Sequence, residues 1–334
     1  MTSFKRYALY HAKSTLLRGA VTAAICLLLC FTFMDVNPGL NENGEFSWVY
    51  IRFSVLAFIL AVLATVMPFL ELSGFKTRRN LDTLFSMPVS RTKMATVHFF
   101  NGLLQLVGIY TLCFLSALVR IPSLHFHTSD LLLPCFAMML LFGVVIYVLI
   151  CFVLVQAETT IDGLVLLALY SFPVPYILIS AIGFFIGFFT REYFYHELAM
   201  GFFLYNPLFN MASRYSNAIV GYKPINVSTV HSVVYLTWLI LSVAAAVGYF
   251  LTFARHRAEQ VGGLSETFFG YRVLIPLVGI ISAIVEPILS TFVMFFIAMV
   301  VGYIIYRRSV RLRRSDLIML AVTTGVFLIS GLIG

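Results

Sequence analysis

Long apolar runs separated by short polar segments constrain the fold of this chain more than any other feature. A helix needs about 20 apolar residues to cross the roughly 30 Å hydrocarbon core of a bilayer. The chain of 334 residues is 61% hydrophobic and only 11% charged, whereas a soluble domain has about 25% charged residues. The sequence therefore predicts an all-α membrane protein and excludes a water-soluble enzyme. Six spans are predicted at residues 16–34, 49–70, 94–119, 131–156, 161–189 and 233–253.

Both ends of the chain extend beyond this six-span core. Residues 1–15 mix basic and aromatic side chains, which is typical of a helix that lies in the membrane interface; an ordinary charged lead-in is the alternative. The run 268–306 is too long for one crossing at about 1.5 Å per residue. A turn at Glu286-Pro287 would divide it into a hairpin of two spans, and a final span is expected at 317–334. The predicted domains are an interfacial helix (1–15), a six-span core (16–255) and a C-terminal extension (256–334).

The basic residues are distributed unevenly between the two predicted sides of the membrane. With a cytoplasmic N-terminus, 17 of the 22 Lys and Arg residues fall on the cytoplasmic side. This is the bias expected of cytoplasmic loops, and it favours the 268–306 hairpin, because a single crossing there would place the arginines of 307–314 outside. The net charge of +8 is therefore assigned to the membrane topology and not to a nucleic-acid partner.

The sequence contains no motif for nucleotide or metal chemistry. It has no P-loop, no H-E-x-x-H and no paired C-x-x-C, and the five cysteines lie inside apolar runs as small hydrophobic residues. His125 and His127 have no third ligand nearby in sequence, so a solvated loop is the preferred interpretation. We therefore predict no catalytic, cofactor-binding or metal-binding residue in this chain. Charged groups are scarce in the predicted spans, which argues against an ion-coupled carrier.

The polar segment 71–93 has the strongest pattern outside the spans. Leu81, Leu84 and Phe85 would share one face of a short helix that Pro88 ends. Such an amphipathic helix, flanked by Arg and Lys, is suited to dock on a partner protein. A solvated basic loop that only fixes the topology is the alternative.

The string NLDTLFSMPVSR within residues 75–93 resembles the first cytoplasmic loop of ABC-2-type transporter permeases. YNPLFNM at 205–211 is similar to a short proline-containing element between spans five and six of that family. The resemblance covers about residues 1–255 and implies a six-span ABC-2-type helical bundle. The C-terminal extension departs from that pattern.

The resemblance implies docking and gating roles for particular residues. A separate nucleotide-binding subunit, which would hold ATP and Mg²⁺, would contact two cytoplasmic segments of this chain. Prolines in the fifth span and in the outer segment would allow a transport path to bend and open. The residues are Lys76, Arg79, Asp82, Leu84, Phe85, Pro88 and Arg91 in the first docking segment, Glu158 and Asp162 in the second, and Pro173, Pro175, Asn206 and Pro207 as pathway or gate candidates.

The expected function is that of a permease subunit of an ATP-driven exporter in the bacterial cytoplasmic membrane. Its partners would be ATPase subunits and a second permease, identical or related. Aliphatic and aromatic spans suit a hydrophobic or amphipathic cargo, such as a peptide antibiotic or a lipid. The alternatives are a membrane sensor or anchor that transports nothing, and an ion-coupled carrier.

Overall fold

The computed structural model divides the chain into two compact units. The first consists of Met1–Val155 and Tyr205–Val261, and the second of Gln156–Leu204 and Gly262–Gly334. The predicted core, 16–255, includes parts of both units. The structure describes residues 3–34, 36–40, 46–51, 53–76, 86, 89–119, 126–171, 204–221, 229–255, 270–271, 274–277, 289–307 and 313–333.

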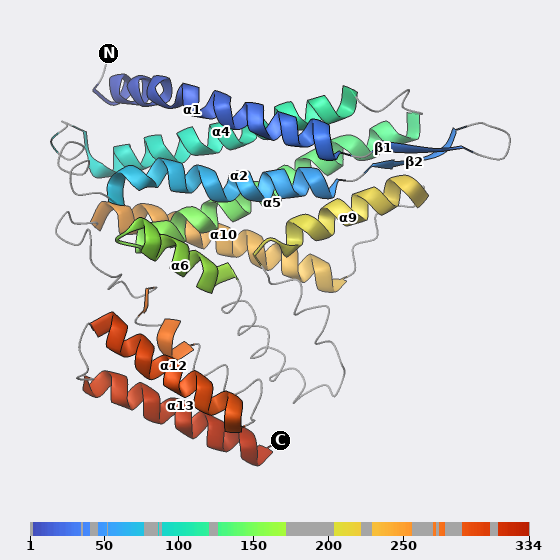
Figure 1. Ribbon diagram of the computed structural model, residues 1–334. Coiled ribbons are helices and arrows are strands. Elements are labelled where there is room, and N and C mark those ends of the chain that lie inside the picture. Colours follow the sequence, from blue (N-terminus) through green and yellow to red (C-terminus); the bar gives the residue numbers. More distant parts are fainter. Residues whose placement is uncertain are drawn as a thin grey trace. The chain divides into compact units, whose positions relative to one another are not determined.

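Five long apolar helices establish a multipass membrane protein. They coincide with five of the predicted spans, and each contains a stretch long and apolar enough to cross a bilayer. In the first unit α4 packs against α1, α2 and α10, and these helices run side by side (Figure 1). The helices are α1 (Ser3–Phe33), α2 (Ser54–Leu72), α4 (Arg91–Val119), α5 (Phe126–Gln156) and α10 (Thr229–Arg255).

The N-terminal helix is longer than a single span requires. α1 continues without a break through the predicted border between residues 15 and 16, and its 31 residues extend about 46 Å at 1.5 Å per residue. The border was placed where the basic residues of 1–18 give way to an apolar run. Because those basic residues are all compatible with helix, the change in composition does not end the helix.

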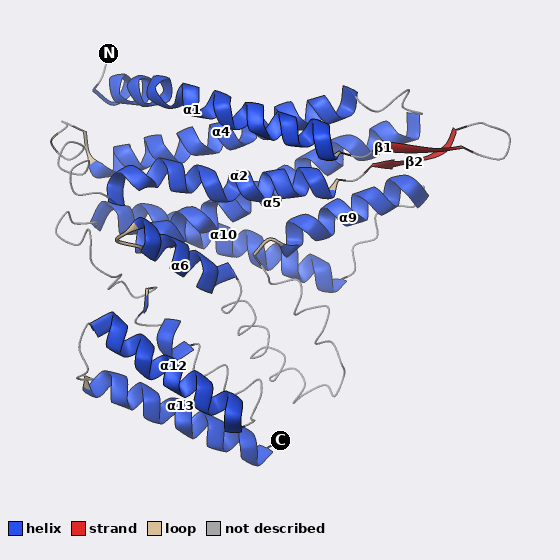
Figure 2. Ribbon diagram, in the orientation of Figure 1, coloured by secondary structure: helices blue, strands red, loops and turns tan. Residues whose placement is uncertain are grey.

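A β-hairpin connects α1 to α2, where the sequence predicted a polar loop. β1 (Val36–Leu40) and β2 (Phe46–Ile51) are antiparallel, with Val36 opposite Ile51 and Gly39 opposite Trp48 (Figure 2). The expected start of the second span at residue 49 is therefore wrong: residues 49–51 belong to β2, and α2 begins at Ser54. The aromatic and β-branched residues of FSWVYI (46–51) favour a strand. By hydropathy alone, the last of these residues are indistinguishable from the start of the apolar run that forms α2.

Buried aromatic residues join α4 to α5 and α10. The ring centroid of Phe99 lies 5.6 Å from that of Tyr147 and 5.4 Å from that of Tyr249. Both tyrosines are fully buried, and their hydroxyls donate to backbone carbonyls of α4, Tyr147 to Phe99 at 2.8 Å and Tyr249 to Ala95 at 3.3 Å. A buried hydroxyl without a partner would be costly. These two hydrogen bonds therefore favour one position of α5 and of α10 along α4.

Among the described residues of the first unit, α9 (Asn206–Gly221) also contacts α2 and β2. The second unit contains α6 (Thr160–Ser171), α12 (Leu289–Arg307) and α13 (Arg314–Ile333). Met299, Tyr303 and Leu320 form a small buried cluster between α12 and α13. α13 matches the predicted final span, and α12 covers the second half of the predicted hairpin. The turn at Glu286-Pro287 lies outside the described residues.

Candidate functional site

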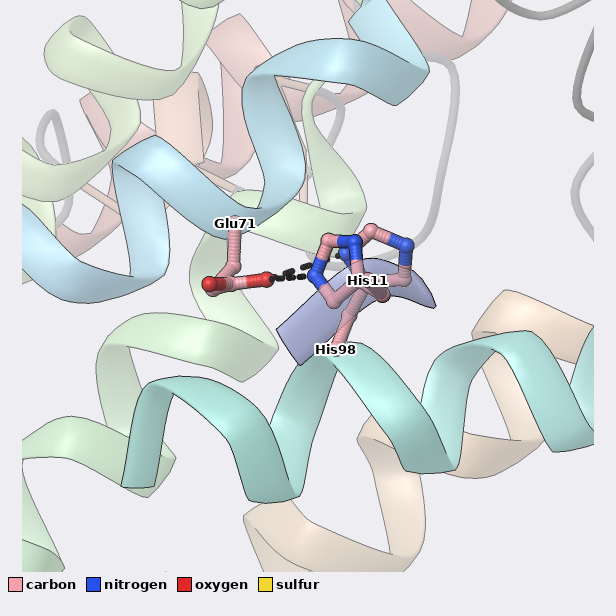
Figure 3. Close-up of side chains that lie close together, drawn as sticks. All are labelled: His11, Glu71 and His98. Atoms are coloured by element: carbon pink, nitrogen blue, oxygen red, sulfur yellow. Dashed lines mark hydrogen bonds and ion pairs between the residues drawn. The ribbon is translucent and has the colours of Figure 1, made fainter. Parts of the chain in front are cut away.

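A buried carboxylate, Glu71 in the last turn of α2, is the centre of a polar cluster. Its side chain is 1% exposed. Oε1 accepts hydrogen bonds from Asn101 Nδ2 at 2.8 Å and from the Arg18 guanidinium. Oε2 lies 2.7 Å from His11 Nε2 and 3.1 Å from His98 Nδ1 (Figure 3). Four donors thus surround one carboxylate, which offsets the high cost of burying its charge.

The donors reach Glu71 because polar residues recur at helical spacing on the two neighbouring helices. Residues three, four or seven positions apart share one face of an α-helix. A polar stripe on α1 therefore faces a polar stripe on α4, with Glu71 of α2 between them. The stripes are Tyr7, His11, Thr15 and Arg18 on α1, and His98, Asn101 and Gln105 on α4.

The hydrogen bonds of the cluster are consistent with an ionised Glu71 that accepts from both histidines. An ionised carboxylate only accepts, so His11 Nε2 and His98 Nδ1 carry protons. His98 Nε2 then accepts from the Tyr7 hydroxyl, 2.9 Å away. The positive charge of Arg18 balances the negative charge of Glu71.

A threonine connects the two polar stripes directly. Thr15 Oγ1 accepts from Asn101 Nδ2 at 3.0 Å and from Gln105 Nε2 at 3.1 Å, and it donates to the His11 carbonyl at 3.0 Å. Arg18 Nη1 also donates to the carbonyl of Leu70 in α2, at 3.1 Å. The cluster therefore holds α1, α2 and α4 together at one end of the first unit.

The first predicted docking segment lies immediately after this cluster in the chain. Lys76, the last residue of the 3-10 turn η1 (Ser73–Lys76), donates from Nζ to the Leu154 carbonyl near the end of α5, at 2.7 Å. Arg91 is the first residue of α4 and is exposed. The other predicted docking residues, Arg79, Asp82, Leu84, Phe85 and Pro88, lie outside the described residues.

In the second predicted docking segment, Glu158 and Asp162 take part in a helix cap. The Asp162 amide donates to Thr159 Oγ1 at 3.0 Å, and Asp162 Oδ2 accepts from the Glu158 amide at 3.0 Å. This reciprocal arrangement resembles a capping box and begins α6. Both residues are buried, and the structure shows this local role for the Glu158 amide and the Asp162 side chain; docking on a partner stays a prediction.

Two of the gate candidates begin a helix. Asn206 and Pro207 are the first residues of α9, where a proline is well tolerated because the first turn of a helix has unpaired amides. Pro173 and Pro175 lie outside the described residues.

The cluster was not predicted from the sequence. Glu71 belongs to the polar segment 71–93 and Arg18 to the start of the predicted span 16–34, and no role was predicted for His11 or His98. The spacing of the two polar stripes was the available signal. Within the described part of the chain, His11, Glu71 and His98 place three potential metal-ligand atoms within 4.8 Å of one another, whereas no metal site was predicted.

No protein-family model, curated protein or solved structure matches this chain. The fold defines the class, a multipass helical membrane protein. A more specific function has to be argued from the geometry of the chain itself.

Proposed function

We propose that this chain is the permease subunit of an ATP-driven exporter in the bacterial cytoplasmic membrane, with ATP hydrolysis on separate subunits. The observation that carries the proposal is the hydrogen bond between Lys76 Nζ and the Leu154 carbonyl. Lys76 is the first residue of the first predicted docking segment, and Leu154 lies four residues before Glu158 of the second in the chain. The hydrogen bond therefore ties the start of the first segment to the end of α5, which the second segment follows in the chain, so one cytoplasmic partner could contact both.

The buried cluster supports the transmission of a movement from such a partner into the bundle. Lys76 links the end of α2 to the end of α5, while Glu71, five residues earlier on the same segment, is bonded to α1 and α4. A displacement of the docking segment would then move the ends of four helices together. In an ATP-driven permease this is the motion that opens and closes the path.

An apolar recess supports a hydrophobic or amphipathic cargo, such as a peptide antibiotic or a lipid. It lies between α1 and the start of α2, and its lining offers a single polar side chain, that of Ser54, which suits an acyl chain or an aliphatic side chain better than an ion. Two permease subunits, identical or related, would enclose the path in the assembled transporter. The lining residues are Leu29, Phe33, Ser54, Val55, Phe58 and Ile59.

Co-purification with a P-loop ATPase encoded in the neighbouring reading frames tests the proposal. We expect Arg79→Glu to lower the amount of bound ATPase about tenfold or more, because it reverses a charge in the docking segment. Arg314→Glu, at an exposed arginine that begins α13, is the matched control and should leave binding unchanged. Proteoliposomes containing the complex should show ATP-dependent efflux of a fluorescent amphipathic peptide or lipid.

Three results would contradict the proposal. First, the wild-type chain retains no ATPase during purification. Second, the ATPase binds but no nucleotide-dependent flux is seen, as expected for a sensor or anchor. The third is flux that follows an imposed ion gradient and ignores ATP, as for an ion-coupled carrier.

A further inference from the structure

We propose that His11, Glu71 and His98 form a binding site for a divalent transition metal of the zinc class. Imidazole nitrogen and carboxylate oxygen are ligands that Zn²⁺ prefers, and a site with two histidines and one carboxylate leaves a fourth position open for water or substrate. The three ligand atoms come from three helices, α1, α2 and α4, and all lie within 4.8 Å of one another (Figure 3). The metal proposal does not rest on the proposed transport function, although both involve Glu71 and its partners.

The spacing of the ligand atoms is close to that of a zinc site. In a tetrahedral site with bonds of about 2.0–2.1 Å, neighbouring ligand atoms are about 3.3 Å apart. Glu71 Oε2 lies 2.7 Å from His11 Nε2 and 3.1 Å from His98 Nδ1. A small outward displacement of the two imidazoles would therefore admit the ion.

Metal binding requires a change of tautomer in each histidine but no loss of a proton. The ring protons that now point at Glu71 would move to the opposite nitrogens, so that His11 Nε2 and His98 Nδ1 present lone pairs to the metal. In His98 the proton would then lie on Nε2 and face the Tyr7 hydroxyl, 2.9 Å away. Metal-bound histidines commonly donate their second N–H to such a partner, which fixes the ring.

The surroundings orient the carboxylate ligand and pack against one of the histidines. Asn101 and Arg18 bind Oε1 of Glu71, so Oε2 is directed at the two histidines. Phe75 packs edge-on against His98, with ring centroids 4.7 Å apart. Ligands that are held in place before binding lose less conformational entropy when the metal arrives.

Arg18 sets the charge balance of the site and therefore its affinity. Its positive charge already balances Glu71, so a divalent ion adds charge that nothing in the cluster neutralises. The metal ion and the Arg18 guanidinium would both contact Glu71, and two positive charges so close together repel strongly in a partly buried environment. The Arg18 side chain is 27% exposed, which lets the guanidinium turn outward, and the 14% exposure of His11 provides a route for the ion.

Zinc titration of the full chain in lipid nanodiscs, followed by calorimetry, tests the site. We expect one saturable Zn²⁺ per chain. His11→Gln or His98→Gln should weaken binding by more than about 100-fold, and Tyr7→Phe by about 10- to 100-fold, the range seen when a partner of a metal-bound histidine is removed. Arg18→Gln should tighten binding, because it removes the competing charge. His231→Gln, in α10, is the control and should bind zinc as wild type does.

Two further measurements make the test decisive even where a variant folds poorly. Zn²⁺ should raise the unfolding temperature of the wild-type chain, since a ligand that binds only the folded state stabilises it. Bound Co²⁺ should show the visible absorption of a tetrahedral ion. Wild-type chain without saturable zinc binding would overturn the proposal, as would wild-type affinity in a folded His11→Gln/His98→Gln double variant. None of these readouts requires an ATPase, so they are separate from the test of transport.

Discussion

Glu71 is buried at the end of an apolar helix, where an unpaired carboxylate would cost several kcal/mol. Its donors, His11, Arg18, His98 and Asn101, all belong to other helices. The charge is therefore compensated only when α1, α2 and α4 have assembled with the correct rotation about their axes. A rotation of any of the three would leave a buried polar group without a partner, so this residue makes the packing of three helices specific.

Replacing Glu71 tests this role at the level of stability. Glu71→Ala should lower the free energy of unfolding by about 3–5 kcal/mol, because it leaves Arg18 and the two histidines without their shared partner. Glu71→Gln should cost less, since the amide still accepts from Asn101. Unfolding in micelles, followed by circular dichroism, measures both, with Lys13→Ala at an exposed position of α1 as the control. A loss below about 1 kcal/mol for Glu71→Ala would show that the cluster is dispensable.

At the level of elements, α4 is the helix on which the first unit is assembled. It contacts α1, α2 and α10. Gly102 of α4 lets side chains of neighbouring helices lie close to its backbone, because small residues permit close packing between membrane helices. A Cβ added at Gly102 would lie 2.5 Å from Tyr147 Oη and 3.0 Å from Glu71 Cγ. At Gly108, on the same helix, a Cβ would have no neighbour within 4 Å.

These two glycines form a matched pair for mutation. Gly102→Ala should destabilise the chain by about 1–3 kcal/mol, because the fully buried Tyr147 has no room to move away. Gly108→Ala should be neutral or stabilising by up to about 1 kcal/mol, since alanine is the better helix former. Thermal unfolding of both variants in the same detergent gives the comparison. Equal effects at the two positions would contradict the close packing of α4 against α5.

For the whole molecule, the described helices and the distribution of basic residues together predict a topology. The predicted cytoplasmic side receives 17 of the 22 Lys and Arg residues, including those on the first half of α1. The β-hairpin that follows α1 would then lie on the opposite side. This predicted topology would also place both predicted docking segments in the cytoplasm, as the proposed ATPase partner requires.

Labelling of single engineered cysteines tests this topology. All five native cysteines are buried, so they give little background with a membrane-impermeant maleimide. Lys13→Cys, at an exposed position of α1, should react only in inside-out vesicles. Asn41→Cys, in the segment between β1 and β2, should react only in intact cells or right-side-out vesicles. Labelling of both positions from the same side would refute the predicted crossing of α1.

The positions of α4 and α10 could be predicted from the sequence to within a few residues, whereas α1 begins 13 residues before the predicted first span. The predicted spans 94–119 and 233–253 correspond to α4 and α10 with small extensions at their ends. The β-hairpin could not be predicted in the same way. Residues 49–51 at the end of β2 are as apolar as the first residues of α2, so hydropathy does not separate the strand from the helix. The partners of Glu71 were also missed, since each appears in the sequence as a single polar residue beside an apolar run.

The sequence by itself determined that this is a multipass helical membrane protein, because the length and hydropathy of a span are local properties of the chain. Only the tertiary structure decided which polar residues meet. His11 and Glu71 are 60 positions apart, and Glu71 and His98 are 27 apart. Their contact depends on how three helices are rotated and packed against one another. The paired polar stripes and the glycine at position 102 make that arrangement favourable, but no local pattern specifies it.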